Sequence, residues 1–326
     1  MHSWEGNPRQ PAGPELATPD YGNAGQDRSI DPEAGGWRIL LAIVAGILLA
    51  VPFATPGARG FFARIAQLLT PRESVTVPQG SGSLSSAEVT RLNHLNAQGQ
   101  AEFLLESAVS RRSGSTEQIM NRAEKWHGKM HLDPKLNSLL TAAFDVDDLE
   151  VRAAAVEVDL AALNLSKTPQ TVARLETTVG SGAQSQRVWA LWELGLLGSR
   201  GVERGRVTQI LENQMQDSDV EVRHWAVEGM AYLGTDEAME LLLKTMHDDS
   251  APSVRERAAC GLAESGMFTN EQRRGAVPRL LDYAEDTSLD GQTRSWTFHA
   301  LRDITGQKLP DDATAWRSWY NTSAGT

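Results

Sequence analysis

Residues 222–234 read Val-Arg-His-Trp-Ala-Val-Glu-Gly-Met-Ala-Tyr-Leu-Gly, and residues 187–198 read Arg-Val-Trp-Ala-Leu-Trp-Glu-Leu-Gly-Leu-Leu-Gly. In both segments an arginine is followed two positions later by a tryptophan and then a small residue, and the segment closes on Leu-Gly. The register continues at Arg152, Arg255 and Arg294, so these five repeat arginines are 35, 36, 32 and 39 residues apart. A period in this range is typical of stacked supersecondary units, not of one closed globular core.

Each repeat is predicted to consist of two helices. Val222, Ala226, Met230 and Leu233 recur at the spacing of one helix face. The second helices of the repeats are expected over about residues 150–163, 186–198, 221–234, 253–265 and 292–304. The first helices are expected over about residues 134–144, 169–178, 202–215, 236–247 and 271–285.

The turn before the second helix is the most specific part of the pattern. Residues 217–223, 147–152 and 248–255 each contain an acidic residue, a short loop, the pair Val-Arg and then small residues. This pattern resembles the HEAT repeat, in particular the short bacterial kind called HEAT-like or PBS-lyase-type repeats, over residues 133 to about 306. In the unit of Arg187, residues 184–186 read Gln-Ser-Gln in place of the acid, and Thr293 replaces the valine before Arg294.

The resemblance implies a structural ladder in which acids and arginines of successive units pair. Its members here are Asp148, Arg152, Arg187, Asp219, Arg223, Asp249, Arg255, Asp290 and Arg294.

A two-helix unit of about 35 residues cannot bury its own apolar face, so it must stack on its neighbours. The sequence therefore predicts an all-α protein, a right-handed α-solenoid of two-helix HEAT-like repeats over residues 133–306 with one concave surface. Residues 87–132 are expected to form the helical N-terminal part of the solenoid. Residues 307–326 are expected to form a C-terminal cap, with Trp316 and either Trp319 or Tyr320 closing the last apolar groove.

The N-terminal part of the chain has a different composition. Residues 1–36 are rich in Gly and Pro and predict a disordered tail. Residues 39–58 contain no charged side chain, and a helix of twenty uncharged residues is long enough to span a bilayer. A single transmembrane helix is therefore predicted over residues 37–58. A cleaved signal peptide is the rival interpretation, but the preceding segment is long and acidic. A juxtamembrane segment and linker follow over residues 59–86.

Orientation and self-association are less constrained by the sequence. Three arginines follow the predicted span and two precede it, which favours a cytoplasmic side for the C-terminal part. Ala42, Gly46 and Ala50 have the spacing of a small-residue face that can pair helices in a membrane.

Charge and cysteine content exclude several classes of function. The net charge is −11; residues 1–36 contribute −4 and residues 37–73 contribute +3, which leaves −10 for the rest. This acidic body argues against nucleic acid as a partner, since lysine and arginine supply most of the affinity for phosphates. A single cysteine, Cys260, excludes an internal disulfide and Cys-based metal or redox motifs, and a buried apolar role is expected for it.

Three tryptophans recur at one repeat position, two residues after the repeat arginine. Trp, Tyr and Arg are enriched in binding hot spots, so these rings form either an aromatic binding stripe or packing between stacked helices. The candidate partner-binding residues are Trp189, Trp192, Trp225, His224, Arg257, Trp296 and His299.

Chemistry-bearing clusters are scarce in this sequence. His127, His131 and Glu124 have the spacing of a metal site on a helix, but Gly128 interrupts it, and solvated polar side chains are the favoured interpretation. Paired acids such as residues 147–148 and 311–312 occupy the positions of helix caps. No metal, no cofactor and no catalytic residue are therefore expected.

These observations predict a membrane-anchored HEAT-repeat scaffold that binds a protein partner through the solenoid surface and is not an enzyme. One alternative is a structural component of an envelope assembly that associates with itself. A minor alternative is an accessory protein similar to chromophore lyases, which rests on the repeat's name alone.

Overall fold

The computed structural model describes residues 82–323. The predicted disordered tail, the predicted transmembrane helix over residues 37–58 and the linker up to residue 81 lie outside these residues. Within residues 82–323, no helix is both long enough and apolar enough to cross a membrane.

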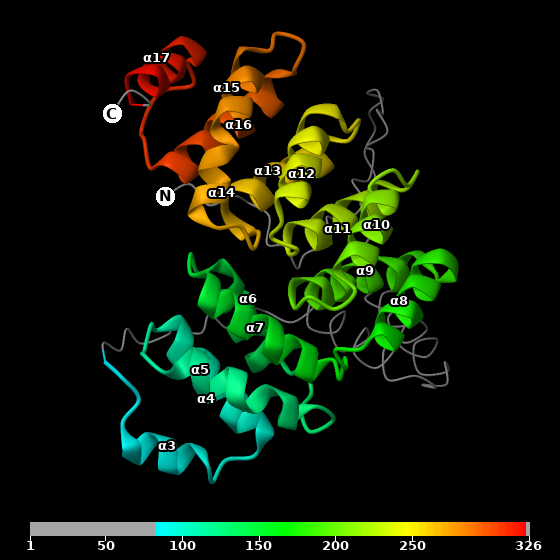
Figure 1. Cartoon of the computed structure of the whole chain (residues 1–326), viewed down its shortest axis with the longest axis vertical. Coiled ribbons are helices and arrows are strands. Elements are labelled where there is room, and N and C mark those ends of the chain that lie inside the picture. The colour runs from blue at the N-terminus through cyan, green and yellow to red at the C-terminus, as the bar shows by residue number, and fades with distance from the viewer. Residues whose placement is uncertain (1–81, 324–326) are drawn as a thin grey trace, which may run out of the picture. The chain divides into compact units, whose positions relative to one another are not determined.

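The described chain is built from helices, which confirms the all-α prediction (Figure 1). Between residues 82 and 323 the structure has no strand; a single isolated β-bridge joins Ser83 to Ser113. The helices are α3 (Ser86–Leu92), α4 (Ala97–Val109), α5 (Ser115–Arg122), the 3-10 turn η1 (Ala123–Trp126), α6 (Pro134–Asp145), α7 (Leu149–Ala162), α8 (Pro169–Ser181), α9 (Gln184–Ser199), α10 (Arg204–Gln214), α11 (Val220–Ala231), α12 (Asp236–Asp248), α13 (Pro252–Cys260), the π-helical turn η2 (Gly261–Ser265), α14 (Asn270–Gly275), α15 (Val277–Glu285), α16 (Gly291–Thr305) and α17 (Ala313–Ser323).

Capping residues set most of these boundaries. Asp148, Asp219 and Asp290 each accept a hydrogen bond from backbone N–H groups of the helix that follows, so the acids of the inter-helix turns are N-caps.

Two helices of the structure differ in detail from the predicted ones. The helix predicted over residues 271–285 is divided into α14 and α15, because Pro278 lacks the N–H that an uninterrupted helix requires. The helix predicted over residues 253–265 ends in the π-helical turn η2.

The helices α8 to α16 form a regular stack. The second helices pack side by side in the order α9, α11, α13 with η2, and α16. The contact between α9 and α11 depends on two glycines: a Cβ atom on Gly195 would lie 2.6 Å from the Cα of Gly229. Three repeat arginines also bind an acid of the next repeat: Arg187 with Asp217, Arg223 with Asp249 at 2.9 Å, and Arg255 with Asp290 at 2.9 Å.

The other two repeat arginines make different bonds. Arg152 donates to the carbonyl of Val146 at 2.8 Å and to that of Gly266 at 2.9 Å. Arg294 donates to the carbonyl of Asp286 at 3.4 Å. Among the five repeat arginines of the described residues, those that pair with an acid of the next repeat thus lie on α9, α11 and α13. A different pair, Arg200 at the end of α9 with Glu157 of α7 at 2.7 Å, joins α7 to α9.

The direction of stacking changes between α7 and α8. Helices α3 to α7 pack among themselves, with α4 against α6 and α5 against α7, whereas α7 makes only a limited contact with α9. The connector contains Asn164 in a left-handed conformation (φ 53°). The edge formed by α6 and α7 instead lies against α9, α11 and η2, which the repeat period had not predicted.

The last helix closes the end of the stack. Helix α17 packs against α15, and the side chain of Trp316 is fully buried. The indole N–H of Trp316 donates to the carbonyl of Pro310 at 2.9 Å.

Candidate functional site

The second helices carry one row of equivalent side chains, which we call the repeat face. It consists of the residues two, five and nine positions after the repeat arginine, because these positions share one side of a helix. Its members are Trp189, Trp192 and Leu196 from α9; Trp225 and Glu228 from α11 with its C-cap Tyr232; Arg257, Cys260 and Glu264 from α13 and η2; and Trp296, His299 and Asp303 from α16.

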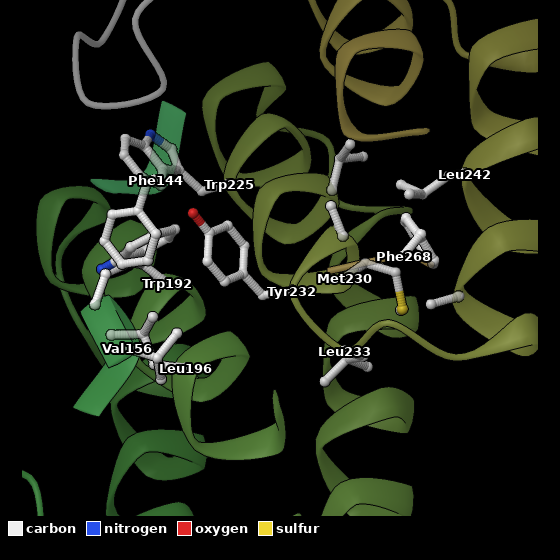
Figure 2. Packing of buried hydrophobic residues seen from close by; sticks show 14 of the residues in the cluster. Phe144, Val156, Trp192, Leu196, Trp225, Met230, Tyr232, Leu233, Leu242 and Phe268 are labelled. Atoms are coloured by element: carbon white, nitrogen blue, oxygen red, sulfur yellow. The ribbon is translucent and has the colours of Figure 1, made fainter. Parts of the chain in front are cut away.

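The part of the repeat face on α9 and α11 is aromatic. The ring centroids of Trp192 and Tyr232 are 4.7 Å apart, those of Trp189 and Trp225 5.7 Å, and those of Trp192 and Trp225 6.4 Å. Phe144, from the end of α6, joins this group with its ring 5.8 Å from Trp192 and 5.4 Å from Tyr232, both edge-to-face (Figure 2). Such geometry is favourable for aromatic quadrupoles, so the group forms a specific contact between α6 and the repeat face.

Burial separates the predicted binding residues into two groups. Trp192, Trp225 and Trp296 are 3%, 4% and 6% exposed, so these three rings fill space between helices. The side chain of Arg257 is also buried. Trp189, His224 and His299 are half-buried, and of these the side chains of Trp189 and His299 retain access to solvent.

The part of the repeat face on α13 contains a buried ion pair. The Nε of Arg257 lies 2.9 Å from Oε2 of Glu228, and the two side chains are 4% and 1% exposed. The guanidinium also donates to the hydroxyl of Ser265 in η2. The Sγ of Cys260 lies 3.7 Å from the same hydroxyl, and burial raises the pKa of this thiol. Cys260 is therefore protonated near neutral pH, and it is not a thiolate nucleophile.

Two further groups on or beside this face have shifted pKa values. Burial, together with the nearby guanidinium of Arg257, lowers the pKa of His224 to about 4, so His224 is neutral at pH 7. Burial and the negative charge of Asp303 raise the pKa of Glu264 to about 7. The side chain of Asp303 is exposed, so the α16 end of the face presents carboxyl groups to solvent.

Two arginines stabilise the turn at η2. Arg152 from α7 and Arg273 from α14 both donate to the carbonyl of Gly266, at 2.9 Å and 3.0 Å. Arg273 also donates to the carbonyls of Ala263 and Glu264. The end of a helix leaves carbonyl groups without backbone partners, and these guanidinium groups satisfy them.

The histidines considered for a metal are placed differently from the helical prediction. The turn η1 ends at Trp126, so His127 and His131 do not share a helix face. Within residues 82–323, no group of three or more His, Cys, Asp or Glu side chains is placed to hold a metal ion. The accessible side chains of the repeat face are the ring of Trp189, the imidazole of His299 and the carboxyl groups of Glu264 and Asp303.

Several residues of the face were missed from the sequence. Glu228, Tyr232 and Glu264 occupy positions equivalent to predicted residues, so applying the register to every repeat finds them. Asp217, the partner of Arg187, was also missed. The repeat pattern points to Asp219, the acid nearest to Val-Arg, but Asp219 caps α11 and accepts a hydrogen bond from Gln184 at 2.6 Å. No feature of the sequence predicts the role of Phe144, because this residue contacts the repeat face only as a result of the change in stacking direction after α7.

Comparison with known proteins agrees with the repeats seen in the structure. Residues 172–263 and 208–302 match the family model described as HEAT repeats, so this part of the chain contains HEAT repeats. No curated protein matches the chain.

Three solved structures, all of engineered or designed proteins, are similar to the chain at low identity. An engineered protein is 18% identical, with 63% of this chain and 96% of that chain covered and a TM-score of 0.32. A designed armadillo repeat protein in complex with the peptide (KR)4 is 18% identical, with coverage of 67% and 98% and a TM-score of 0.30. Another designed armadillo repeat protein is 17% identical, with coverage of 74% and 98% and a TM-score of 0.29.

Proposed function

We propose that the chain is a non-catalytic scaffold that binds a protein partner through the repeat face and is held at a membrane by residues 37–58. The observation that carries the binding role is the repeat face itself, a row of equivalent side chains that continues across four helices. Stacked helical repeats offer such extended surfaces to peptides and helices.

The accessible residues of the face define the chemistry of the partner. Trp189 and His299 are half-buried, so each can order against a partner at a small cost in conformational freedom. Asp303 is exposed and Glu264 lies near it, which favours a partner segment with positive charge. The net charge of −10 over residues 74–326 favours the same kind of partner over long range.

The proposed anchor is supported by the twenty uncharged residues 39–58. Alkaline extraction of cell membranes tests it. The full chain should stay in the membrane pellet, and a chain without residues 39–58 should move to the supernatant. Release of the full chain into the supernatant would contradict the anchor and leave the binding role untouched.

Site-specific photocrosslinking in cells tests the binding role. We place a photoreactive amino acid at His299 in the full chain and, as a control, at Glu240 on the exposed side of α12. A crosslink to one particular polypeptide from position 299, and none from position 240, supports binding at the repeat face. Equal crosslinks from both positions, or crosslinks only from position 240, contradict it.

A further inference from the structure

The aromatic part of the repeat face is occupied by the chain itself. We define the α6–α7 corner as residues 144–152, which join α6 to the first turn of α7. Phe144, at one end of this corner, packs edge-to-face against Trp192 and Tyr232. Arg152, at the other end, is 2% exposed and reaches the carbonyl of Gly266, 114 residues further along the chain. The corner therefore holds the face by one ring and one guanidinium.

This attachment can be released without leaving Gly266 unsatisfied. Its carbonyl also accepts a bond from Arg273, so it keeps a partner when Arg152 leaves. The helices α3 to α7 have their own packing contacts, and α7 touches α9 only in part. Beyond the corner, Glu157 of α7 pairs with Arg200 at the end of α9 at 2.7 Å, so this part of α7 stays attached to α9 when the corner moves away.

The occupied face also has an unused donor. The indole N–H of Trp192 is buried, and within the described residues it has no hydrogen-bond acceptor. A buried donor without an acceptor destabilises the structure that contains it. The α6–α7 corner fits the rings of the face but does not satisfy this group, whereas a segment that places a carbonyl there would do both.

We propose that the α6–α7 corner is an internal ligand of the repeat face, and that a protein partner displaces it with a segment of the same chemistry: an aromatic ring, an arginine about eight residues further on, and a backbone carbonyl for Trp192. This inference rests on the proposed function, since it assumes that partners bind the repeat face. It identifies their segment and adds competition with the chain's own corner.

Displacement of the corner can be measured without a partner. Cys260, the single cysteine of the chain, precedes η2 directly and is 8% exposed. Its Sγ lies 3.7 Å from the hydroxyl of Ser265, next to the Gly266 carbonyl that Arg152 holds. The rate of its reaction with a thiol reagent, in the full chain in detergent, therefore reports how often η2 opens when Arg152 lets go. Arg152→Ala should raise the rate about tenfold or more, because it removes the charge-assisted hydrogen bond that holds the corner to the carbonyl of Gly266.

Arg187→Ala is the matched control for thiol labelling. It removes another repeat arginine, but one whose partners, Asp217 and Gln214, belong to the neighbouring repeat. Urea unfolding of both variants shows whether each remains folded under the labelling conditions. Equal labelling rates in Arg152→Ala and Arg187→Ala would overturn the proposal.

A synthetic peptide tests the predicted chemistry of the partner. A fluorescent peptide of residues 142–153 is titrated into the full chain and followed by anisotropy. The Arg152→Ala protein should bind it about tenfold more tightly than the unchanged protein, since its own corner competes less well. A peptide with alanine at both Phe144 and Arg152 should lose this binding. The proposal is contradicted if the peptide binds both proteins with equal affinity, or if the alanine substitutions in the peptide do not weaken its binding.

Two further results separate this inference from the proposed function. If a partner crosslinks at position 299 but Arg152→Ala leaves the labelling rate of Cys260 unchanged, the repeat face binds a partner and the α6–α7 corner is a fixed part of the structure. A complex of the Arg152→Ala variant with the unchanged chain, absent when Arg187→Ala replaces that variant, would assign the face to the corner of a second copy and overturn a separate protein partner.

Discussion

At the scale of single residues, the neighbours of a side chain decide its role more than its repeat position does. Arg257 stands where Trp225 and Trp296 stand in other repeats, yet all three are buried. The tryptophans are apolar enough to fill this space. The charge of Arg257 is stabilised there by Glu228 on the adjacent helix, whose Oε2 lies 2.9 Å from its Nε.

Breaking this buried pair should destabilise the protein strongly. Glu228→Gln leaves the guanidinium of Arg257 without a counter-charge, which should lower the free energy of unfolding by about 3–5 kcal/mol. The double variant Glu228→Leu and Arg257→Met should recover most of that loss. Urea unfolding measures both; a Glu228→Gln variant as stable as the unchanged protein would mean that the pair is not buried in solution.

The tryptophans of the repeat face should differ in what they stabilise. Trp225 is 4% exposed and its indole N–H donates to Glu221 at 2.9 Å, so Trp225→Ala should cost about 3–5 kcal/mol of folding free energy. Trp189 is half-buried, so Trp189→Ala should cost clearly less and mainly weaken partner binding. Thermal unfolding of the two variants, beside capture of the partner crosslinked at position 299, separates packing from binding. Equal losses of stability would contradict this difference.

At the scale of elements, most helices could be predicted from the sequence because apolar spacing and capping residues mark them locally. The second helices predicted at 150–163 and 292–304 begin and end within one residue of α7 and α16. The π-helical turn η2 could not be predicted in this way. Its carbonyls are held by Arg152 and Arg273, and only Arg273 is near it in sequence.

The crossing of α9 and α11 should be sensitive to one methyl group. A Cβ atom at Gly195 would lie 2.6 Å from a backbone atom of Gly229, so Gly195→Ala must separate the helices and should cost about 1–3 kcal/mol or more. Gly180→Ala is the control, since α8 has open space there and alanine should add about 0.5–1 kcal/mol of stability. Opposite signs in urea unfolding are expected; two stabilised variants would show that the helices do not approach this closely.

The joint between α12 and α15 should depend on pH. His247 lies between Asp286 at 2.9 Å and Asp248 at 2.6 Å, and the hydrogen bond to Asp286 raises the pKa of His247. A raised folded-state pKa means that this stabilisation is fully present below about pH 6.5 and is lost as the pH rises through the folded value. The pKa values of both carboxyl groups are lowered, so they stay ionised over this range.

Replacing the imidazole should remove this part of the pH dependence. We expect the free energy of unfolding of the unchanged protein to fall more steeply between about pH 6 and 8 than that of His247→Gln. Glu264, whose pKa is raised to about 7, contributes a decrease of the same sign to both proteins, so their difference isolates His247. Parallel curves from urea unfolding at several pH values would exclude the role of this histidine.

At the scale of the whole molecule, the repeat period in the sequence predicts that the helices stack, but it does not predict where the direction of stacking changes. Residues 172–302 contain HEAT repeats, and the period found in the sequence reflects them. The period also includes Arg152, but this arginine bonds to Gly266 and pairs with no acid of the following repeat. A contact over 114 residues depends on the path of the connector at 163–168, and no local pattern encodes that path.

In this account the repeat face binds a protein and the α6–α7 corner competes for this face. The most direct test is to measure how tightly the full chain binds the partner that is crosslinked at position 299. We expect Arg152→Ala to bind this partner about tenfold more tightly than the unchanged protein, and a Trp189→Ala, His299→Ala double variant to bind it about tenfold more weakly while remaining equally folded. If Arg152→Ala and the double variant both bind with unchanged affinity, the partner uses another surface and the account is wrong.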